Sequence, residues 1–475
     1  MRSIRILALL ALPALSPAQS RTLSAADSAL VRRILLAEDR RDSTSAALRQ
    51  GAAHGNARVR VIAQRALGRI RDPQFAIRDS LPPLPAPTAW SEPAWRRRYR
   101  ALADQKNDCG VLRSALADST WHVRLRAVDL APTTCAMDDA LVSTLRTWID
   151  ALPANAARRA RGDVSWHAAA HSVVALARLR PIEARSRVSR LAGHRQWQVR
   201  MYSARAAALL TDTLTLRLLA RDTDANVQEA AIEALSKLKG HADDDIYIAA
   251  LGAKGAQAVR AAAIALKASP RPDVPVAANR AFERWVARRN ASERDARVAL
   301  LEAAGRPASD DRAPNPRVAL PPRAVALALG ADARLRVTMA RSSGGGSFVI
   351  RARGDVAPIM AARVLALARA GYYDGGNWHR VEPDFVIQGA GPGTNEYVGY
   401  AQYFRDELGT VPHARGTVGM STRSHDTGDA QWFVNLKDNA RLGRDYTVFA
   451  EVVEGMDIVD GILEGDVVSR VIVLP

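Results

Sequence analysis

The chain contains 475 residues, 48% of them hydrophobic, which is enough for two to four globular units whose cores need no metal or disulfide. Its formal net charge is +18, but the excess is confined to residues 1–330, which carry +21, whereas residues 331–475 carry −3. Only 6 of the 67 basic residues are lysines, and this uniform arginine bias is typical of genome composition, so we exclude nucleic acid as a partner. Attraction to acidic proteins or to lipid surfaces stays open as a use of the charge.

The N-terminal residues have the pattern of a secretory signal. Arg2 and Arg5 precede the apolar stretch from Ile6 to Leu15, and small residues follow as far as Ala18. We therefore predict a signal peptide over residues 1–18 and an exported, periplasmic protein. No later stretch reaches about 18 apolar residues, so no membrane span is expected.

From residue 19 to residue 305 the apolar residues recur at intervals of three and four, which is the helical period. A local pattern returns at steps of 28 to 43 residues, for example as "WHVRLRAVDLA" from Trp121, "WQVRMYSARAAAL" from Trp197 and "AVRAAAIAL" from Ala258. Such periods predict stacked helix pairs. The stretches resemble HEAT-type repeats, so residues 19–305 are predicted to form an all-α solenoid whose long surface binds protein partners.

The only two cysteines, Cys109 and Cys135, lie 26 residues apart within this predicted array. An oxidising compartment would let them form a disulfide that stabilises the fold by roughly 3 to 4 kcal/mol. Two unpaired buried thiols are the alternative. No metal is expected, because two thiols do not complete a tetrahedral shell, and His167 and His171 have neither a glutamate between them nor a third ligand nearby.

Residues 306–330 are predicted to be a proline-rich linker, because they carry neither a helical nor a strand period. Beyond them the period changes to two, and "LRVTMA" and "SFVIRA" around "RSSGGG" predict a hairpin. A helix from Pro358 to Gly371 and several short strands follow. This order over residues 331–475 predicts a closed antiparallel β-barrel, and we expect residues 325–475 to work as an independent unit.

Three motifs lie in consistent order in this last part: "GYYDGGNWHRVEPDFVIQGAGP" from Gly371, "GTVGMSTRSHDTGDAQWFVNL" from Gly416 and "YTVFAEVVEGMDIVDGI" from Tyr446. Together they resemble the cyclophilin-type peptidyl-prolyl isomerases. The resemblance implies a closed eight-stranded barrel capped by two helices, and catalysis of cis–trans exchange at X-Pro bonds in proline-containing client polypeptides. It implies no cofactor.

The resemblance also implies a site. Arg380 is the expected catalytic residue, because a guanidinium directed at the amide nitrogen would stabilise the twisted peptide bond. The expected substrate-binding residues are Phe385, Phe433 and Leu442 in a proline pocket, Gln388 on the substrate backbone, Tyr446 where the family often has histidine, and Ser421, Thr422 and Gln431 along the peptide groove.

Four positions depart from the family pattern. Val386 replaces a more usual methionine, Arg441 stands where some members have tryptophan, Asp429 where glycine is common, and Arg423 where a small residue borders the groove. We expect these changes to alter affinity and substrate preference more than catalysis. The alternative function is a module that binds proline peptides, or a scaffold, without turnover; the retention of Arg380 together with the aromatic pocket favours the enzyme.

Overall fold

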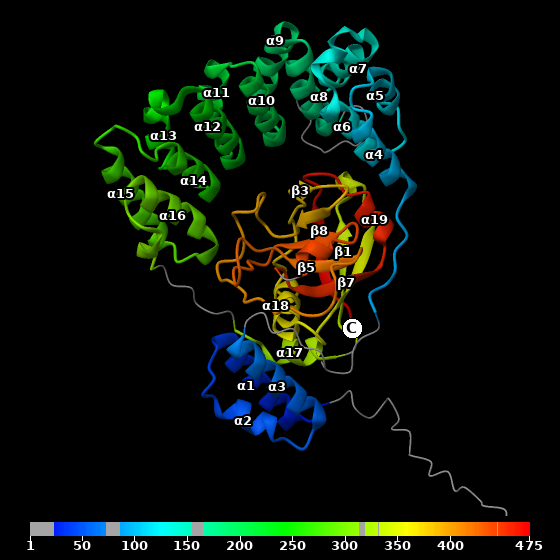
Figure 1. Cartoon of the computed structure of the whole chain (residues 1–475), viewed down its shortest axis with the longest axis vertical. Helices are drawn as coiled ribbons and strands as arrows, with labels where there is room; N and C mark the ends of the chain where they lie inside the picture. The colour runs from blue at the N-terminus through cyan, green and yellow to red at the C-terminus, as the bar shows by residue number, and fades with distance from the viewer. Residues whose placement is uncertain (1–22, 73–85, 154–164, 313–318, 331, 444) are drawn as a thin grey trace, which may run out of the picture.

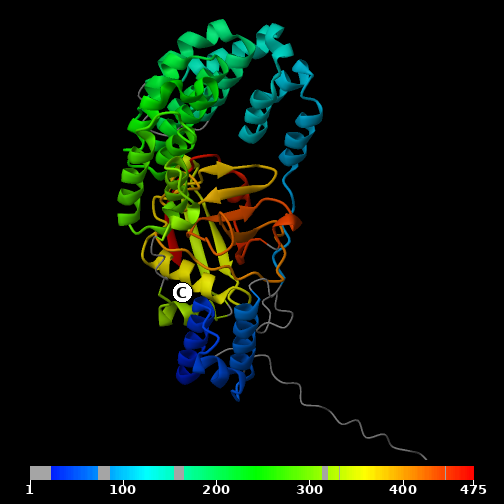
Figure 2. The same cartoon turned by 60° about the vertical axis from the view of Figure 1, so that its left-hand side comes forward.

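The computed structural model describes residues 23–72, 86–153, 165–312, 319–330, 332–443 and 445–475. The signal peptide predicted at residues 1–18 lies outside these ranges. Helices α4 to α16 form an arch around a part that contains the β-sheet, and α1 to α3 lie at the end of that part opposite the arch (Figures 1 and 2). Within the described ranges, no helix is both long enough and apolar enough to cross a membrane.

The arch consists of two layers of helices. The even-numbered helices from α4 to α16 pack successively on one another as an inner layer, and the odd-numbered helices from α5 to α15 lie outside them (Figure 1). Buried alanines such as Ala169, Ala204 and Ala262 leave room for the inner helices to approach one another. This stacking agrees with the predicted helical repeats. The helices are α4 (Ala94–Asp104), α5 (Cys109–Ala115), α6 (Trp121–Leu130), α7 (Asp139–Asp150), α8 (Trp166–Leu179), α9 (Pro181–Ala192), α10 (Trp197–Leu209), α11 (Thr213–Leu219), α12 (Ala225–Lys239), α13 (Asp244–Ala250), α14 (Ala256–Ala265), α15 (Val274–Ala287) and α16 (Arg294–Ala303).

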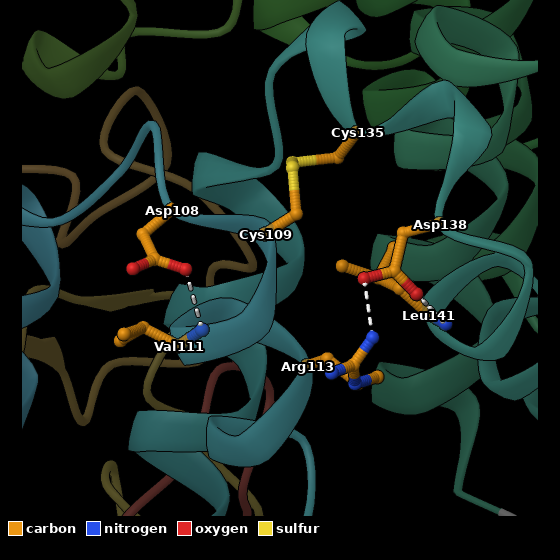
Figure 3. Close-up of a disulfide and its surroundings, with 7 residues drawn as sticks. All are labelled: Asp108, Cys109, Val111, Arg113, Cys135, Asp138 and Leu141. Atoms are coloured by element: carbon orange, nitrogen blue, oxygen red, sulfur yellow. Dashed lines mark hydrogen bonds and ion pairs between the residues drawn. A yellow bond between two sulfur atoms is a disulfide. The ribbon is translucent and has the colours of Figure 1, made fainter.

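A disulfide fastens the beginning of the arch. It joins Cys109, the first residue of α5, to Cys135 in the short 3-10 helix Thr133–Met137, with the two Cα atoms 5.5 Å apart (Figure 3). An ion pair of 2.8 Å between Arg113 and Asp138 lies beside it. The covalent link and the ion pair therefore hold α5 against the segment that leads into α7.

The first three helices, α1 (Ala25–Arg40), α2 (Ala46–Ala52) and α3 (Ala57–Arg71), differ from the single array predicted over residues 19–305. Their apolar faces share one core with the sheet, separate from the core of the arch. In this core Arg65 of α3 lies 2.6 Å from Glu38 and 3.3 Å from Glu407, and all three side chains are buried. Removal of one partner from a buried pair typically costs about 3–5 kcal/mol, so these contacts fasten α3 to the sheet-containing part.

Part of the predicted linker is also folded. Residues Pro322–Ala328 form helix α17, which packs on α18 (Pro358–Arg369), and Leu320 and Val325 are buried in the core that α1 to α3 share. Segments before residue 325 thus complete the core of residues 325–475, which argues against the expectation that those residues form an independent unit.

The eight strands form one antiparallel sheet in the order β3-β4-β6-β5-β7-β2-β1-β8. The predicted closed barrel is wrong: among the described residues no ladder joins β3 to β8, and the sheet is an open, curled half-barrel. The reason is that β3 has only two residues and pairs with β4 alone. The strands are β1 (Arg334–Met339), β2 (Ser347–Ala352), β3 (Arg380–Val381), β4 (Val386–Gly389), β5 (Thr417–Met420), β6 (Trp432–Asn435), β7 (Val448–Glu454) and β8 (Val468–Val473).

Aromatic side chains fill the concave side of this sheet. Trp378 and Trp432 meet edge to face with ring centroids 5.8 Å apart, and Phe348 and Phe449 pack around them, all fully buried. Helix α18 packs on β7 and β8, and the short helix α19 (Met456–Asp460) packs on β2. The two helices expected from the resemblance are thus present, and the rigid sheet positions the loops and strand ends described next.

Candidate active site

Four neighbouring strands bring residues that are distant in sequence into one row. Arg380 of β3 is directly opposite Gln388 of β4, which is opposite Phe433 of β6. Phe433 is in turn opposite Gly419 of β5. Directly paired residues have their side chains on the same face of a sheet, so the guanidinium, the amide and the ring face the same side. Only glycine fits at the end of the row, because a Cβ on Gly419 would lie 2.3 Å from the Phe433 ring.

Hydrogen bonds fix the polar side chains of this row. Arg380 Nη1 donates to Gln388 Oε1 (3.1 Å), and Gln388 Nε2 donates to Ser421 Oγ (2.9 Å). Arg380 also forms an ion pair with Glu382, with Nε 2.9 Å and Nη2 2.5 Å from Oε1. The Arg380 side chain is 41% exposed, so its guanidinium is held in place while it remains open to a ligand.

Apolar side chains form a small cluster next to the guanidinium. Val386, Phe433 and Leu442 are buried in it, and Phe385 and Tyr446 are partly buried against them. Phe433 and Tyr446 meet edge to face with centroids 5.6 Å apart. The cluster lines a pocket of about 120 Å³ that Arg380 borders. The arrangement offers a dry floor for a small apolar ring and a cation at its edge.

Eight of the nine catalytic and substrate-binding residues expected from the sequence line this one pocket. Gln431 does not: it is buried, and its Nε2 donates to the backbone oxygens of Asn395 (3.2 Å) and Val398 (2.9 Å). It holds the loop beside the pocket and is a positioning residue. The eight are Arg380, Phe385, Gln388, Ser421, Thr422, Phe433, Leu442 and Tyr446.

The departures from the family pattern interact with one another or with the pocket. Arg423 lines the pocket and forms an ion pair of 3.0 Å with Asp429, so these two departures from the family pattern contact each other. Arg441 places its guanidinium carbon 4.4 Å from the centroid of the Phe385 ring and covers that ring. Glu396, which sequence reasoning did not select, also lines the pocket. In the sequence, only the unusual charged residues at positions 423 and 429 could have indicated the ion pair between Arg423 and Asp429.

His379, next to the catalytic candidate, is neutral. Burial, and then the charge of Arg380, lower the pKa of His379 to about 4. Both ring nitrogens are buried and have no hydrogen-bond partner within the described part of the chain. The ring therefore adds no charge beside the Arg380 guanidinium.

The arch reaches the loops on one side of the pocket. Asn226 of α12 donates to Thr394 Oγ1 (2.8 Å) and accepts from Asn395 Nδ2 (2.9 Å). At the end of the arch, the Ser292 carbonyl oxygen accepts from Arg423 (2.7 Å), and Asp295 of α16 forms an ion pair of 2.6 Å with the same guanidinium. A wall of the pocket is therefore supported by the helical layer.

The beginning of the arch contacts the sheet-containing part from the other side. Asp460 of α19 binds two guanidinium groups, Arg96 of α4 at 2.7 Å and Arg415 at 2.6 Å. Further along, the hydroxyl of Tyr202 in α10 donates to Glu464 (2.8 Å). The inner layer, expected to present a free protein-binding surface, thus contacts its own C-terminal part at several points.

Comparison with known proteins identifies this C-terminal part. The family model for "Cyclophilin type peptidyl-prolyl cis-trans isomerase/CLD" matches residues 336–473. A peptidyl-prolyl cis-trans isomerase of Helicobacter pylori is 33% identical over 120 residues, covering 24% of this chain and 74% of the relative. Peptidyl-prolyl cis-trans isomerase B of Escherichia coli K12 is 36% identical over 128 residues, covering 25% and 78%.

A crystal structure of a cyclophilin-type isomerase from Cryptosporidium parvum aligns with 30% of this chain and 98% of its own, at 18% identity and a TM-score of 0.28. The curated relatives carry the assignment, because each exceeds 30% identity over about three quarters of its own length. Through residues 336–473 the chain belongs to the cyclophilin-type peptidyl-prolyl cis-trans isomerase family.

Proposed function

We propose that the chain is an exported isomerase that accelerates cis–trans exchange at X-Pro bonds of polypeptides, in the service of protein folding. The observation that carries this proposal is the row in which Arg380, Gln388 and Phe433 face the same side of four paired strands. The apolar cluster has the size for a proline ring, and the cation stands at its edge.

The chemistry follows from the amide bond. Rotation about it costs about 18–20 kcal/mol, because the nitrogen lone pair is delocalised into the carbonyl. A guanidinium beside that nitrogen stabilises the twisted state, and one such preorganised donor typically supplies about 3–4 kcal/mol. Gln388 helps to hold the substrate: its Nε2 uses one hydrogen on Ser421 and keeps the other for a substrate carbonyl.

The test is an isomerisation assay on the purified full-length protein with a short X-Pro peptide. Arg380→Ala should lower kcat/KM at least about a hundredfold, in line with the donor magnitude. Arg336→Ala is the matched control, since Arg336 is exposed on β1 outside the pocket. Unchanged turnover in a folded Arg380→Ala variant would refute the mechanism.

One contact favours a second candidate, a module that binds proline peptides without useful turnover. The Arg380 guanidinium already has a carboxylate partner in Glu382, which reduces its attraction for the amide nitrogen. Both side chains are substantially exposed, however, and such pairs contribute only about 0–1 kcal/mol, so a substrate can displace Glu382. Peptide binding without isomerisation, in both the natural chain and a Glu382→Gln variant, would establish the second candidate.

Export to the periplasm is part of the proposal. It rests on the signal pattern of residues 1–18 and on the disulfide between Cys109 and Cys135, a bond that persists in oxidising compartments. N-terminal sequencing of the protein from its native cells should give a mature chain that starts after Ala18. An intact N-terminus on a cytosolic protein would contradict the export.

A further inference from the structure

A second, larger cavity adjoins the proline pocket. It is a cleft of about 530 Å³ between the inner helices α10 and α12 on one side and residues 394–397 of the sheet-containing part on the other. Arg380 and Glu396 line both the pocket and the cleft. A peptide with its proline in the pocket therefore has a direct path for its neighbouring residues into the cleft.

Acidic side chains dominate the cleft. Four glutamates line it against two arginines, Arg205 and Arg380. Arg380 pairs with Glu382, and the guanidinium carbon of Arg205 lies 4.4 Å from the ring centroid of Tyr202. The four glutamates are Glu229, Glu233, Glu396 and Glu464.

The partly buried Glu229 lacks a close cation and so holds a proton at neutral pH. The nearest cation to Glu229 is Arg260, at 3.8 Å. Burial, and then repulsion from Glu233, raise the pKa of Glu229 to about 8. A cation that entered the cleft would lower this pKa and gain a partly buried carboxylate as its partner.

Two further features suit a ligand side chain with a long stem. Trp197 and Met201 of α10 line the cleft and offer apolar surface, and the face of an indole attracts ammonium and guanidinium groups. His379 lines the same cleft with a neutral ring, which adds no positive charge that would repel a cationic side chain.

We propose that the arch and the sheet-containing part together form an extended peptide groove, in which the cleft binds a lysine or arginine side chain next to the X-Pro bond. The inference rests on the proposed function, because it takes the smaller pocket to be the proline pocket. In this arrangement the helical layer selects the clients of the isomerase by their charge.

The test uses eight-residue peptides with one central proline, in which lysine, alanine or glutamate is placed in turn at each of three positions on either side. Binding to the full-length protein is measured by fluorescence anisotropy, and turnover by the isomerisation assay. At one or two positions lysine should bind at least about tenfold more tightly than glutamate, and the preference should weaken as salt screens the charges.

The variant Glu229→Gln/Glu233→Gln should reduce the lysine-to-glutamate ratio to within about twofold. Glu283→Gln/Glu302→Gln is the control, because both residues are exposed on α15 and α16 and line neither cavity. If the first variant does not fold, Glu233→Lys at an exposed position decides instead and should reverse the preference. Equal binding of lysine and glutamate peptides at every position, or a preference that survives these changes, would overturn the inference.

The two proposals fail in different ways. Selective binding of lysine peptides without isomerisation would remove the proposed activity and leave the cleft as a binding site. Isomerisation without any charge preference would leave the activity and remove the inference.

Discussion

Replacement of Arg423 by alanine tests whether the arch supports the pocket through one ionic contact. Arg423 is 15% exposed and pairs with Asp429, which is 3% exposed, at 3.0 Å. Two of its other partners, Asp295 at 2.6 Å and the Ser292 carbonyl oxygen at 2.7 Å, belong to the end of the arch, and a third is the backbone oxygen of Glu396. The substitution therefore removes contacts to the arch and leaves a buried carboxylate without its cation.

The first part of the expected loss of stability comes from the Asp429 carboxyl. Burial raises the pKa of Asp429 to about 6, against the opposing effect of Arg423. Without the arginine the pKa of Asp429 rises further. At pH 7 the buried carboxyl can then take up a proton, which limits the added loss of stability to about 1.4 kcal/mol, the equivalent of one pKa unit. The two lost contacts to the arch add about 0.5–1.5 kcal/mol each, the usual net contribution of a hydrogen bond. We expect a total of about 3 kcal/mol at pH 7.

The pH dependence separates this reasoning from a general packing defect. A carboxyl whose pKa is raised in the folded state loses its stabilising proton as the pH rises through that pKa. The natural chain passes this point near pH 6 and the variant at a higher pH, so the stability difference should grow between pH 6 and pH 8. Urea unfolding at pH 5.5, 7 and 8 measures it, with Arg423→Ala/Asp429→Asn as the control that should lack the pH dependence. A difference below about 1 kcal/mol at pH 8, or one that is constant with pH, would refute the argument.

Three further predictions concern the fold. Cys109→Ser/Cys135→Ser should lower the free energy of unfolding by about 3–4 kcal/mol for this loop length, and equal urea midpoints for the variant and the oxidised natural chain would contradict it. Residues 325–475 alone should be unstable, because Glu407 loses its arginine partners and the core loses α1 to α3; a cooperatively folded, active fragment in thermal unfolding would count against this. Glu229→Gln should gain stability relative to the natural chain as the pH rises from 6 to 9, because the proton that Glu229 holds in the folded state is lost through about pH 8; a pH-independent difference in melting temperature would argue otherwise.

Much of the pocket could be predicted because the motifs lie within strands. The alternation of side chains along β4 and β6 places Gln388 and Phe433 on one face, and strand pairing then brings Arg380 beside them. The place of Gln431 outside the pocket could not be predicted, because its side chain binds the backbone oxygens of a loop and no periodicity indicates how a loop folds. The prediction of a closed barrel was wrong at β3, because this strand is only two residues long.

The position of α1 to α3 could not be predicted from their helical period. An amphipathic period shows that one face of a helix is buried, but it does not show what covers that face. Besides Glu38, Arg65 and Arg69 pair with Glu407, more than 330 residues away in the sequence, and nothing local indicates this second partner. Arginines on the buried face of α3 were the available signal, because a buried guanidinium needs a carboxylate from some other element.

The charge of the chain shows why an average over a long segment does not identify clients. Many arginines of the arch form ion pairs between successive helix pairs, such as Arg146 with Glu183 at 2.8 Å and Arg200 with Asp222 at 2.6 Å. Exposed charges act over about 10 Å at 0.1 M salt, so a peptide in the groove responds to the glutamates around it and not to the net +21 of residues 1–330. The composition alone pointed to acidic partners, whereas the cleft beside the pocket favours basic ones. If lysine peptides bind less tightly as salt is added, that loss therefore reports on the cleft. If acidic proteins bind less tightly as salt is added, that loss reports on the outer surface of the arch.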